Sequence, residues 1–374
     1  MRRAIIHIGM PRTGSTSFQE VLAGLRPDLA EAGLLYPELA PPGSHPDLNV
    51  NHQPLGEVLD GRRPRGERAV VLGRLDEALR RTGADTLILS YEDFSVQRRR
   101  FGVPETLRGI LARHGFALEV LMVVKPPFDF LNSAYAHRAQ LIRETGSFRD
   151  YLAHHWRSGR IDYRALVAPW AEAADGRVTA VPLADRRSAV PLVGRIVAAL
   201  GLGDRLGTLM GTAAATYRTN RSSGPLAVAA SRRLRALRVH RQVVGHPRRI
   251  GHALDQAAWA RGLDPEPFRG DAPEYRARID AHTFETRERF AQLAWGQPWD
   301  AVVAPGHEGP PNELAHRAIP AETEAQVAAL VRETMRRFDV RAPAPLLARP
   351  AAWIEDGAMG LARLAGIESR WRVC

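Results

Sequence analysis

The chain has 374 residues, 45% hydrophobic and 25% charged, which excludes a disordered chain, a collagen-like repeat and a disulfide scaffold. Lys and Arg total 52 against 41 Asp and Glu, a net charge of +11 that favours anionic partners without naming one, and Lys125 is the only lysine. The single cysteine, Cys374, excludes intramolecular disulfides, thiolate-rich zinc sites and a CxxC redox pair.

The N-terminal apolar run, residues 4–8, is too short for the apolar core of a signal peptide and is predicted to be a strand. Nowhere do 18 consecutive apolar residues occur, which is the length that a membrane-spanning helix requires. We therefore expect a cytoplasmic protein.

Short apolar runs bounded by helix and strand breakers predict four buried parallel strands at residues 4–8, 86–90, 118–124 and 178–183. Helical patterns lie between them, at residues 15–32, 68–81, 105–114 and 128–143. Because alternating strands and helices require crossover connections, the sequence predicts the α/β class with a three-layer parallel sheet.

The rest of the chain is expected to be mainly helical from about residue 189, with amphipathic segments at 189–200, 224–244, 272–293 and 322–338. An irregular stretch at 37–66, rich in Pro, Gly, Asn and His, is predicted to be a long loop insertion of the kind that is often functional. We predict one domain over residues 1–340, followed by a Pro/Ala-rich linker and short tail at 341–374.

The loop after the first predicted strand has the pattern of an anion site. Gly9 and Gly14 have the spacing of a P-loop, but Ser15 stands where the lysine is expected and the nearest cation is Arg12. Glycines let backbone N–H groups turn inward around an anion, and the following helix adds the positive end of its dipole. The alternative is a strand–helix turn, capped by Ser or Thr, that binds nothing. The cation and the nearby hydroxyls favour the anion site; these hydroxyls belong to Thr13, Ser15, Thr16 and Ser17.

At these residues the sequence resembles the sulfotransferase family that uses 3'-phosphoadenosine-5'-phosphosulfate (PAPS), in particular its bacterial branch, whose members begin with a strand, a Gly-x-Pro-Lys-Thr-Gly-Thr-Thr-Ser loop and a helix. The resemblance implies a P-loop-like sulfotransferase fold and places Arg12 at the family's lysine. Arginine keeps the charge but not the compact ammonium. The implied ligands of the 5'-phosphosulfate are Arg12, Thr13, Gly14, Ser15, Thr16 and Ser17, and Arg12 is also expected to steady the leaving phosphate during catalysis.

Lys125 ends the third predicted strand, at the edge of the sheet where ligands of open α/β sheets bind. The family is similar here, with an arginine at the strand end and a serine eight residues later that together hold the 3'-phosphate of PAPS. The resemblance assigns these roles to Lys125 and Ser133, with lysine losing the bidentate grip of arginine. The alternative is a surface cation and a solvent-facing serine.

Sulfuryl transfer to a hydroxyl or an amine needs a base for the acceptor's proton. Glu92 follows the strand at 86–90, and the family is similar in placing an acceptor-activating His or Glu near this edge of the sheet. Glu92 is our first candidate, with a solvated acid or an arginine partner as its alternative reading. His52, in the long loop, is the second candidate; its alternative is a surface histidine.

Two other functions remain open. A P-loop kinase with a relocated cation would need an acid at a strand end to hold Mg²⁺, and Lys125 stands there instead, so we predict no metal cofactor. A protein that binds polyanions or nucleic acid would use the arginines of residues 232–249, which we expect to form a solvated helix face, or else to meet an anionic acceptor or a membrane surface. Without a nucleic-acid module we expect no specific nucleic acid; the expected acceptor is a small alcohol, a carbohydrate or a lipid-linked sugar.

Overall fold

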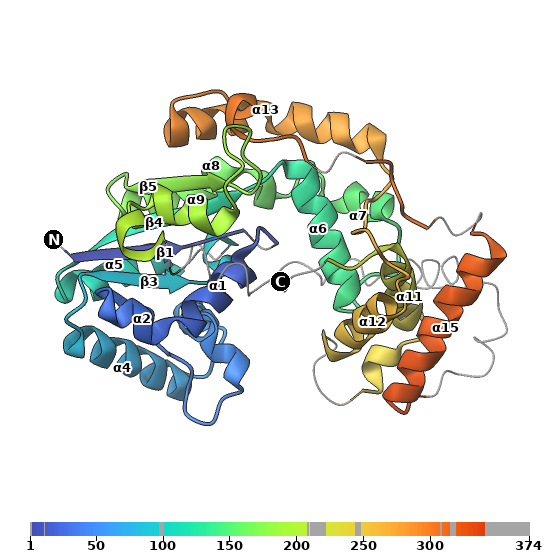
Figure 1. The fold of residues 1–374 in the computed structure, drawn as a ribbon, viewed down its shortest axis with the longest axis horizontal. Helices are drawn as coiled ribbons and strands as arrows, with labels where there is room; N and C mark the ends of the chain where they lie inside the picture. The colour runs from blue at the N-terminus through green and yellow to red at the C-terminus, as the bar shows by residue number, and fades with distance from the viewer. Residues whose placement is uncertain are drawn as a thin grey trace. The chain divides into compact units, whose positions relative to one another are not determined.

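The computed structural model describes residues 2–10, 12–96, 101–207, 209, 222–243, 248–306, 309–314 and 319–340 (Figure 1). The chain divides into two compact units. Unit 1 comprises residues 1–130, 157–220 and 280–307, and unit 2 comprises residues 131–156, 221–279 and 308–374. The predicted domain at 1–340 thus spans both units, and the predicted tail at 341–374 lies outside the described residues.

Unit 1 is built on a five-stranded sheet with the order β2-β3-β1-β4-β5, in which every pair is parallel. The strands are β1 (Arg2–His7), β2 (Leu34–Leu35), β3 (Thr86–Ser90), β4 (Phe116–Val124) and β5 (Val178–Pro182). The four predicted strands and the α/β class are confirmed. The sequence missed β2, a two-residue edge strand that is too short to give a periodic pattern.

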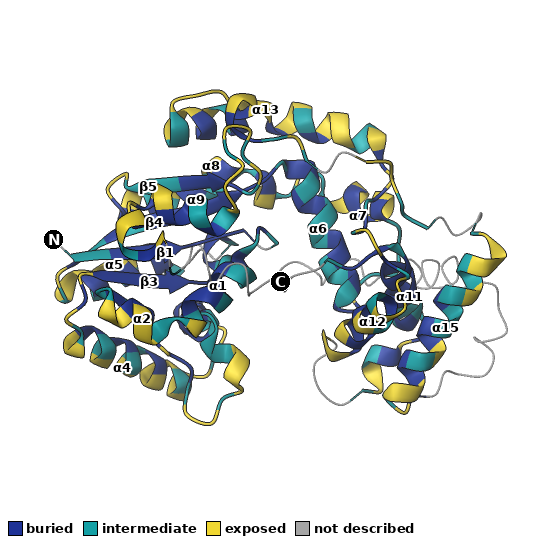
Figure 2. Ribbon diagram, in the orientation of Figure 1, coloured by how far each residue is buried: buried dark blue, intermediate teal, exposed yellow. Residues whose placement is uncertain are grey.

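Helices cover both faces of this sheet and make the predicted three layers. On one face, Ile5 and Ile88 belong to a core shared with α1 (Ser15–Gly24), α2 (Arg26–Glu31) and α9 (Leu192–Ala199). On the other face, α5 (Val103–Arg113) and α8 (Tyr163–Ala173) contact β4 and contribute no side chain to that core. Figure 2 shows the result, with buried strands between helices whose outer faces are exposed.

Two predicted elements of unit 1 differ from the structure. The helix predicted at 15–32 is divided at Leu25, whose φ is −103°, because Pro27 in the following turn lacks a backbone donor and begins a new helix. The loop predicted at 37–66 was expected to be irregular, but it contains the 3₁₀ helix η1 (Pro46–Asn49), helix α3 (Gln53–Leu59) and the start of α4 (Arg65–Arg81). The buried apolar side chains of α3 explain why this stretch folds onto α4.

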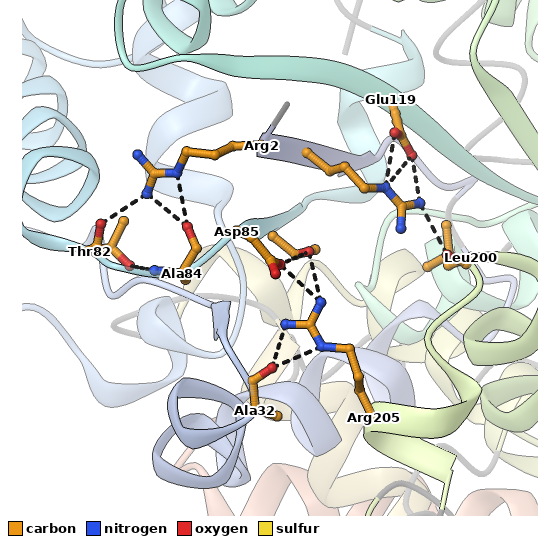
Figure 3. Close-up of polar contacts among 10 residues, drawn as sticks. Arg2, Ala32, Thr82, Ala84, Asp85, Glu119, Leu200 and Arg205 are labelled. Carbon is orange, nitrogen blue, oxygen red and sulfur yellow. Dashed lines mark hydrogen bonds and ion pairs between the residues drawn. The ribbon is translucent and has the colours of Figure 1, made fainter.

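Arginines form hydrogen bonds at the amino ends of the strands (Figure 3). The P-loop-like segment follows the carboxyl end of β1, at the opposite ends of the strands. Arg2 donates to the carbonyls of Thr82 and Ala84 at 2.9 and 2.8 Å. Arg205 donates to the carbonyl of Ala32 at 2.9 Å and to the carboxylate of Asp85 at the same distance. Because these guanidinium groups satisfy backbone carbonyls and an exposed carboxylate at the ends of the strands, part of the basic charge of the chain is structural.

Unit 2 is helical. Its core joins three helices that contact one another, α11 (Pro225–Ala236), α12 (Arg248–Ala260) and α15 (Ala321–Arg337). The helix predicted at 224–244 ends early, because Arg238 adopts a left-handed conformation with φ +58° and η5 (Val239–Arg241) follows. The sequence also missed α7 (Phe148–His155), α8, α12 and the short α14 (Trp299–Val302). Helices α6 (Pro127–Gln140) and α13 (Pro273–Trp295) each have one end in each unit.

The sequence predicted that the arginines of residues 232–249 form a solvated helix face. The structure shows that this is not true of all of them. Arg232 is only 2% exposed; it donates to the carbonyl of Thr145 at 3.2 Å and lies 3.6 Å from the carboxylate of Glu313. Arg233 forms an ion pair with Glu324 at 2.5 Å. These two arginines therefore hold unit 2 together. Within the part of the chain that is described, no helix is long and apolar enough to cross a bilayer.

Candidate functional site

The candidate site lies at the carboxyl ends of β3, β1 and β4 in unit 1. β1 pairs with β3 on one side and with β4 on the other, so the chain leaves neighbouring strands in different directions at this edge. Ligands of open α/β sheets bind in the crevice outside the strand ends at such a switch point. The segments that leave these strands begin at Ile8, Tyr91 and Lys125.

The loop between β1 and α1 contains three left-handed residues among those that the structure describes. Gly9, Arg12 and Gly14 have left-handed φ values of 47°, 68° and 81°. Left-handed residues help to turn backbone N–H groups toward one side of a loop, which is how loops of this kind hold anions. Gly14 occupies the N-cap position of α1 and has no side chain to cap the helix, which leaves the first N–H groups for an anion.

Arg12 is the one non-glycine residue among these left-handed positions. The conformation costs an arginine roughly 1–2 kcal/mol relative to glycine. Strain of this kind persists where the surroundings hold a residue in place, and it is common at ligand-binding loops. The conformation of Arg12 therefore supports a binding role for the loop beyond a simple strand–helix turn.

The loop hydroxyls do not all have the same surroundings. The Thr13 hydroxyl is buried and donates to the carbonyl of Met10 at 2.6 Å, so it holds the loop closed. Ser15 is also buried, and its Oγ lies 3.5 Å from that of Thr13. Thr16 and Ser17, at the start of α1, are half-buried. The predicted contacts of these hydroxyls with a ligand remain predictions.

Lys125 reaches the same loop from the end of β4. Its Nζ donates to the backbone carbonyl of Arg12 at 2.9 Å, and the side chain is 5% exposed. Burial and, after it, the Arg12 guanidinium together lower the pKa of Lys125 to about 7, against the carboxylate of Asp129, which acts to raise it. The only lysine of the chain thus contacts the loop expected to hold the 5' end of the donor. Ser133, its predicted partner, lies on the part of α6 that belongs to unit 2.

Glu92 lies beside the loop. It begins the 3₁₀ helix η2 (Glu92–Val96), which is separated from β3 by Tyr91 alone, and the N–H of Ser95 in η2 donates to the Ile8 carbonyl at 3.2 Å. A Cβ placed on Gly9 would lie 3.3 Å from the Glu92 Cα, so only glycine lets the two segments approach this closely. Glu92 is half-buried. The residue predicted to be the base and the predicted anion loop are therefore neighbours.

His52 has surroundings that disfavour the role of a base. It is fully buried; its Nδ1 accepts the Ser90 N–H at 2.9 Å and its Nε2 lies 3.0 Å from the Pro37 carbonyl. Nε2 must therefore carry the proton and donate it. Burial is the main cause that lowers the pKa of His52 to about 3. Neither nitrogen can take an acceptor's proton without losing a backbone bond. His52, the second candidate for the base, is not the surface histidine of the alternative reading either, and it connects β3 with the long loop.

The sequence reasoning missed a buried polar cluster behind the loop. The Nδ1 of His7 lies 2.7 Å from the Oγ of Ser90, and the Nε2 of Gln19 donates to that same oxygen at 3.0 Å. All three side chains are buried, and burial lowers the pKa of His7 to about 4. The available signal was a histidine within the apolar run Ile5–Ile8 and a glutamine on the buried face of α1.

The described residues contain no group of three or more His, Cys, Asp or Glu side chains placed to hold a metal ion. The prediction that the protein uses no metal remains a prediction.

Comparisons with known proteins found one distant structural similarity. No family model matches the chain, and no curated protein matches it. Among solved structures, the chain is similar to the crystal structure of a sulfotransferase from Alicyclobacillus acidocaldarius, with 18% sequence identity and a TM-score of 0.33 over 57% of this chain and 93% of that one. A likeness at this level decides no function, so the function must be argued from the site itself.

Proposed function

We propose that the protein is a sulfotransferase that takes a sulfuryl group from PAPS and transfers it to a hydroxyl or amine of a carbohydrate, a lipid-linked sugar or a small alcohol. One observation carries the proposal: the position of a Cβ on Gly9 is 3.3 Å from both the Glu92 Cα and the Ser15 Oγ. An anion loop and a carboxylate residue meet there, and sulfuryl transfer needs both a site for the donor and a base for the acceptor.

The loop fits the 5'-phosphosulfate end of the donor. Its left-handed residues and the uncapped start of α1 offer N–H groups, and Arg12 and Lys125 bring two cations to the same segment. Burial and, after it, repulsion by the Arg12 guanidinium lower the pKa of Lys125, and a bound anion would offset both effects. We propose that the set predicted from sequence binds the donor here: Arg12, Thr13, Gly14, Ser15, Thr16 and Ser17.

Bound PAPS would supply an activated sulfuryl group and a good leaving group, adenosine 3',5'-bisphosphate. As the acceptor's oxygen or nitrogen forms its bond to sulfur, Glu92 takes the proton from that atom. Glu92 must be ionised to do so. Arg12 stabilises the negative charge that develops on the phosphate oxygen as the old S–O bond breaks. A preorganised cation at the loop is sufficient for that purpose without a metal ion in the proposed mechanism.

Lys125 is proposed to add its charge at the loop, on the basis of its bond to the Arg12 carbonyl. Its predicted pairing with Ser133 at the 3'-phosphate remains a prediction.

The kinase and polyanion hypotheses receive no comparable support. A cation, Lys125, stands where a kinase would place an acid for Mg²⁺, and Arg232 and Arg233 are engaged within unit 2. Thermal unfolding separates the possibilities, because a ligand that binds the folded chain raises its Tm. We expect adenosine 3',5'-bisphosphate to raise the Tm and heparin to have little effect. A large shift with ATP and Mg²⁺, and none with the bisphosphate, would favour the kinase.

A further inference from the structure

His7 is a buried titratable residue to which the proposed mechanism gives no role. It is the last residue of β1, it is fully buried, and it pairs in register with Ser90 of β3 and Leu121 of β4. Its ring and that of Phe18 in α1 pack in a T-shaped arrangement, with 5.5 Å between the ring centroids. A histidine at the centre of a parallel sheet needs partners for both nitrogens, since an unsatisfied buried polar atom is unfavourable.

The hydrogen bonds of its neighbours determine where the His7 proton lies. The Asn51 amide donates to Gln19 Oε1 at 3.5 Å, which directs Gln19 Nε2 toward the Ser90 hydroxyl oxygen. Among the described residues, Ser90 Oγ has two hydrogen-bond partners, the Gln19 Nε2 donor and His7 Nδ1 at 2.7 Å, so Nδ1 is the acceptor available to the Ser90 hydroxyl proton. Nδ1 is then the acceptor, and Nε2 carries the ring proton.

This Nε2 is buried and has no hydrogen-bond partner among the residues that the structure describes. It is directed into the loop, because it lies 3.3 Å from the position that a Cβ on Gly9 would occupy. The Ser15 Oγ lies 3.3 Å from that same position. The unsatisfied donor thus faces the loop at Gly9, where no side chain stands between Nε2 and the start of α1.

We propose that His7 is a binding residue of the loop, whose Nε2–H donates to an oxygen of the anion held there. The proposal rests on the proposed function for the identity of the anion, which is the sulfuryl or phosphate group at the 5' end of the donor. Ser90 and Gln19 are positioning residues that keep the His7 proton on Nε2. Because burial lowers the pKa of His7 to about 4, the ring stays neutral and remains a donor throughout the neutral range.

Gly9 has a defined part in this arrangement. Any side chain at position 9 would occupy the space between Nε2 and the bound anion and would be strained at a φ of 47°. The glycine therefore provides both the turn and the path from the His7 donor to the ligand.

The direct test is nuclear magnetic resonance of the full chain labelled with ¹⁵N at histidine, with adenosine 3',5'-bisphosphate and inorganic sulfate as probes and calorimetry to establish binding. The His7 signal is assigned as the one lost in His7→Gln. We expect an Nε2–H tautomer whose proton signal shifts and exchanges more slowly when the bisphosphate binds. If the bisphosphate binds and the His7 signals do not move, or the proton lies on Nδ1, the inference is wrong while the proposed function survives.

The two probes keep the hypotheses apart. If sulfate moves the His7 signals and the bisphosphate does not bind, the anion contact holds and the proposed donor is wrong. If neither probe binds, both are wrong.

A matched pair of variants measures the contribution of Nε2–H. Glutamine can place an N–H near the position of Nε2, whereas asparagine reaches only the position of Nδ1. We expect His7→Asn to weaken the bisphosphate roughly 10- to 100-fold, the range for a hydrogen bond to a charged group, and His7→Gln to retain most of the affinity. Equal affinity of His7→Asn and the wild-type protein would overturn the inference. Should a variant not fold, the spectra of the wild-type protein still decide.

Discussion

Lys125 and Arg12 bring like charges to one end of the loop, and this affects the stability of the free protein. Burial first, and then the Arg12 guanidinium, lower the pKa of Lys125 from 10.5 to about 7, against the carboxylate of Asp129. Between these two values the unfolded chain holds a proton that the folded chain lacks, so the stability contributed by this group rises with pH. The full stability contribution of Lys125 is present above pH 10.5 and is lost as the pH falls through 7.

A bound anion should reverse this effect by returning the proton to Lys125. We therefore expect the affinity for adenosine 3',5'-bisphosphate to fall as the pH rises above about 7, by up to about tenfold per pH unit. Calorimetry from about pH 6 to about pH 9 measures this slope. In Lys125→Arg the cation stays charged, so the same series should be nearly flat. A flat series for the wild-type protein would show that Lys125 does not sense the ligand.

Glu92 is the residue on which the proposed chemistry depends. Glu92→Gln keeps the shape of the side chain and removes its basicity, so kcat should fall by on the order of 10²–10⁴-fold with little change in donor affinity. Asp93→Asn is the control, since this neighbouring acid is bonded to the Tyr91 hydroxyl at 3.2 Å and has no proposed role. We expect it to keep most of the activity in a sulfuryl-transfer assay. Nearly full activity of Glu92→Gln would require a different base.

The sequence could place Glu92 and Lys125 because each follows a strand, and parallel strands end at one edge of a sheet. It could not place the histidines. His52 lies in a polar stretch, and its burial depends on Tyr36, whose ring lies 4.7 Å away, and on the backbone of β3. His7 lies in an apolar run, and its role emerges only when the strand register brings Ser90 beside it. Long-range pairing of this kind leaves no local signal.

At the scale of elements, α12 and the end of α6 are in close contact within unit 2. The Gln140 side chain donates to the Asp255 carboxylate at 2.5 Å, and a Cβ on Gly251 would lie 1.7 Å from the Gln140 carbonyl oxygen. That oxygen belongs to the backbone and cannot move aside cheaply. A Cβ placed on Gly109, within α5, would meet no other part of the described structure within 4 Å. The two helical glycines therefore offer a matched comparison.

Alanine at these two positions should have opposite effects on the free energy of unfolding. Gly109→Ala should stabilise the protein by about 0.5–1 kcal/mol, because alanine is the better helix former. Gly251→Ala gains the same helix propensity, but the new Cβ must displace the backbone of Gln140. We therefore expect the free energy of unfolding to fall by about 2 kcal/mol or more. Urea unfolding followed by circular dichroism measures both. Equal effects of the two substitutions would mean that α12 and α6 are not packed as described.

Element prediction succeeded where a pattern was long enough to repeat. The apolar run at β3 gave the strand with its observed bounds, Thr86–Ser90. The two-residue β2 gave none, and the composition of residues 37–66 concealed α3, whose Pro54 lies in the first turn of a helix where proline is tolerated. Composition identified a segment without regular periodicity, while the packing of α3 against α4 determined its structure.

At the scale of the whole molecule, the excess of arginine serves structure as well as charge. Arginines satisfy carbonyls at the amino edge of the sheet, and Arg232 is buried in unit 2. Net charge alone could not distinguish these arginines from ones that meet a ligand. The division into two units was also hidden, because each unit is assembled from three separate stretches of the chain and no linker marks the boundary.

Calorimetric titration of the full chain with adenosine 3',5'-bisphosphate and with AMP tests the central claim most directly, because the two nucleotides share the 5'-phosphate and differ only in the 3'-phosphate. A site built for PAPS should bind the bisphosphate at least about tenfold more tightly, the effect of one additional charged hydrogen bond. Lys125→Ala should weaken the bisphosphate by about 1.5–3 kcal/mol, and Arg68→Met, which removes a cation from the exposed surface of α4, should leave it unchanged. Equal affinity for the bisphosphate and AMP, or no binding of either, would contradict the assignment of this chain as a PAPS-dependent sulfotransferase.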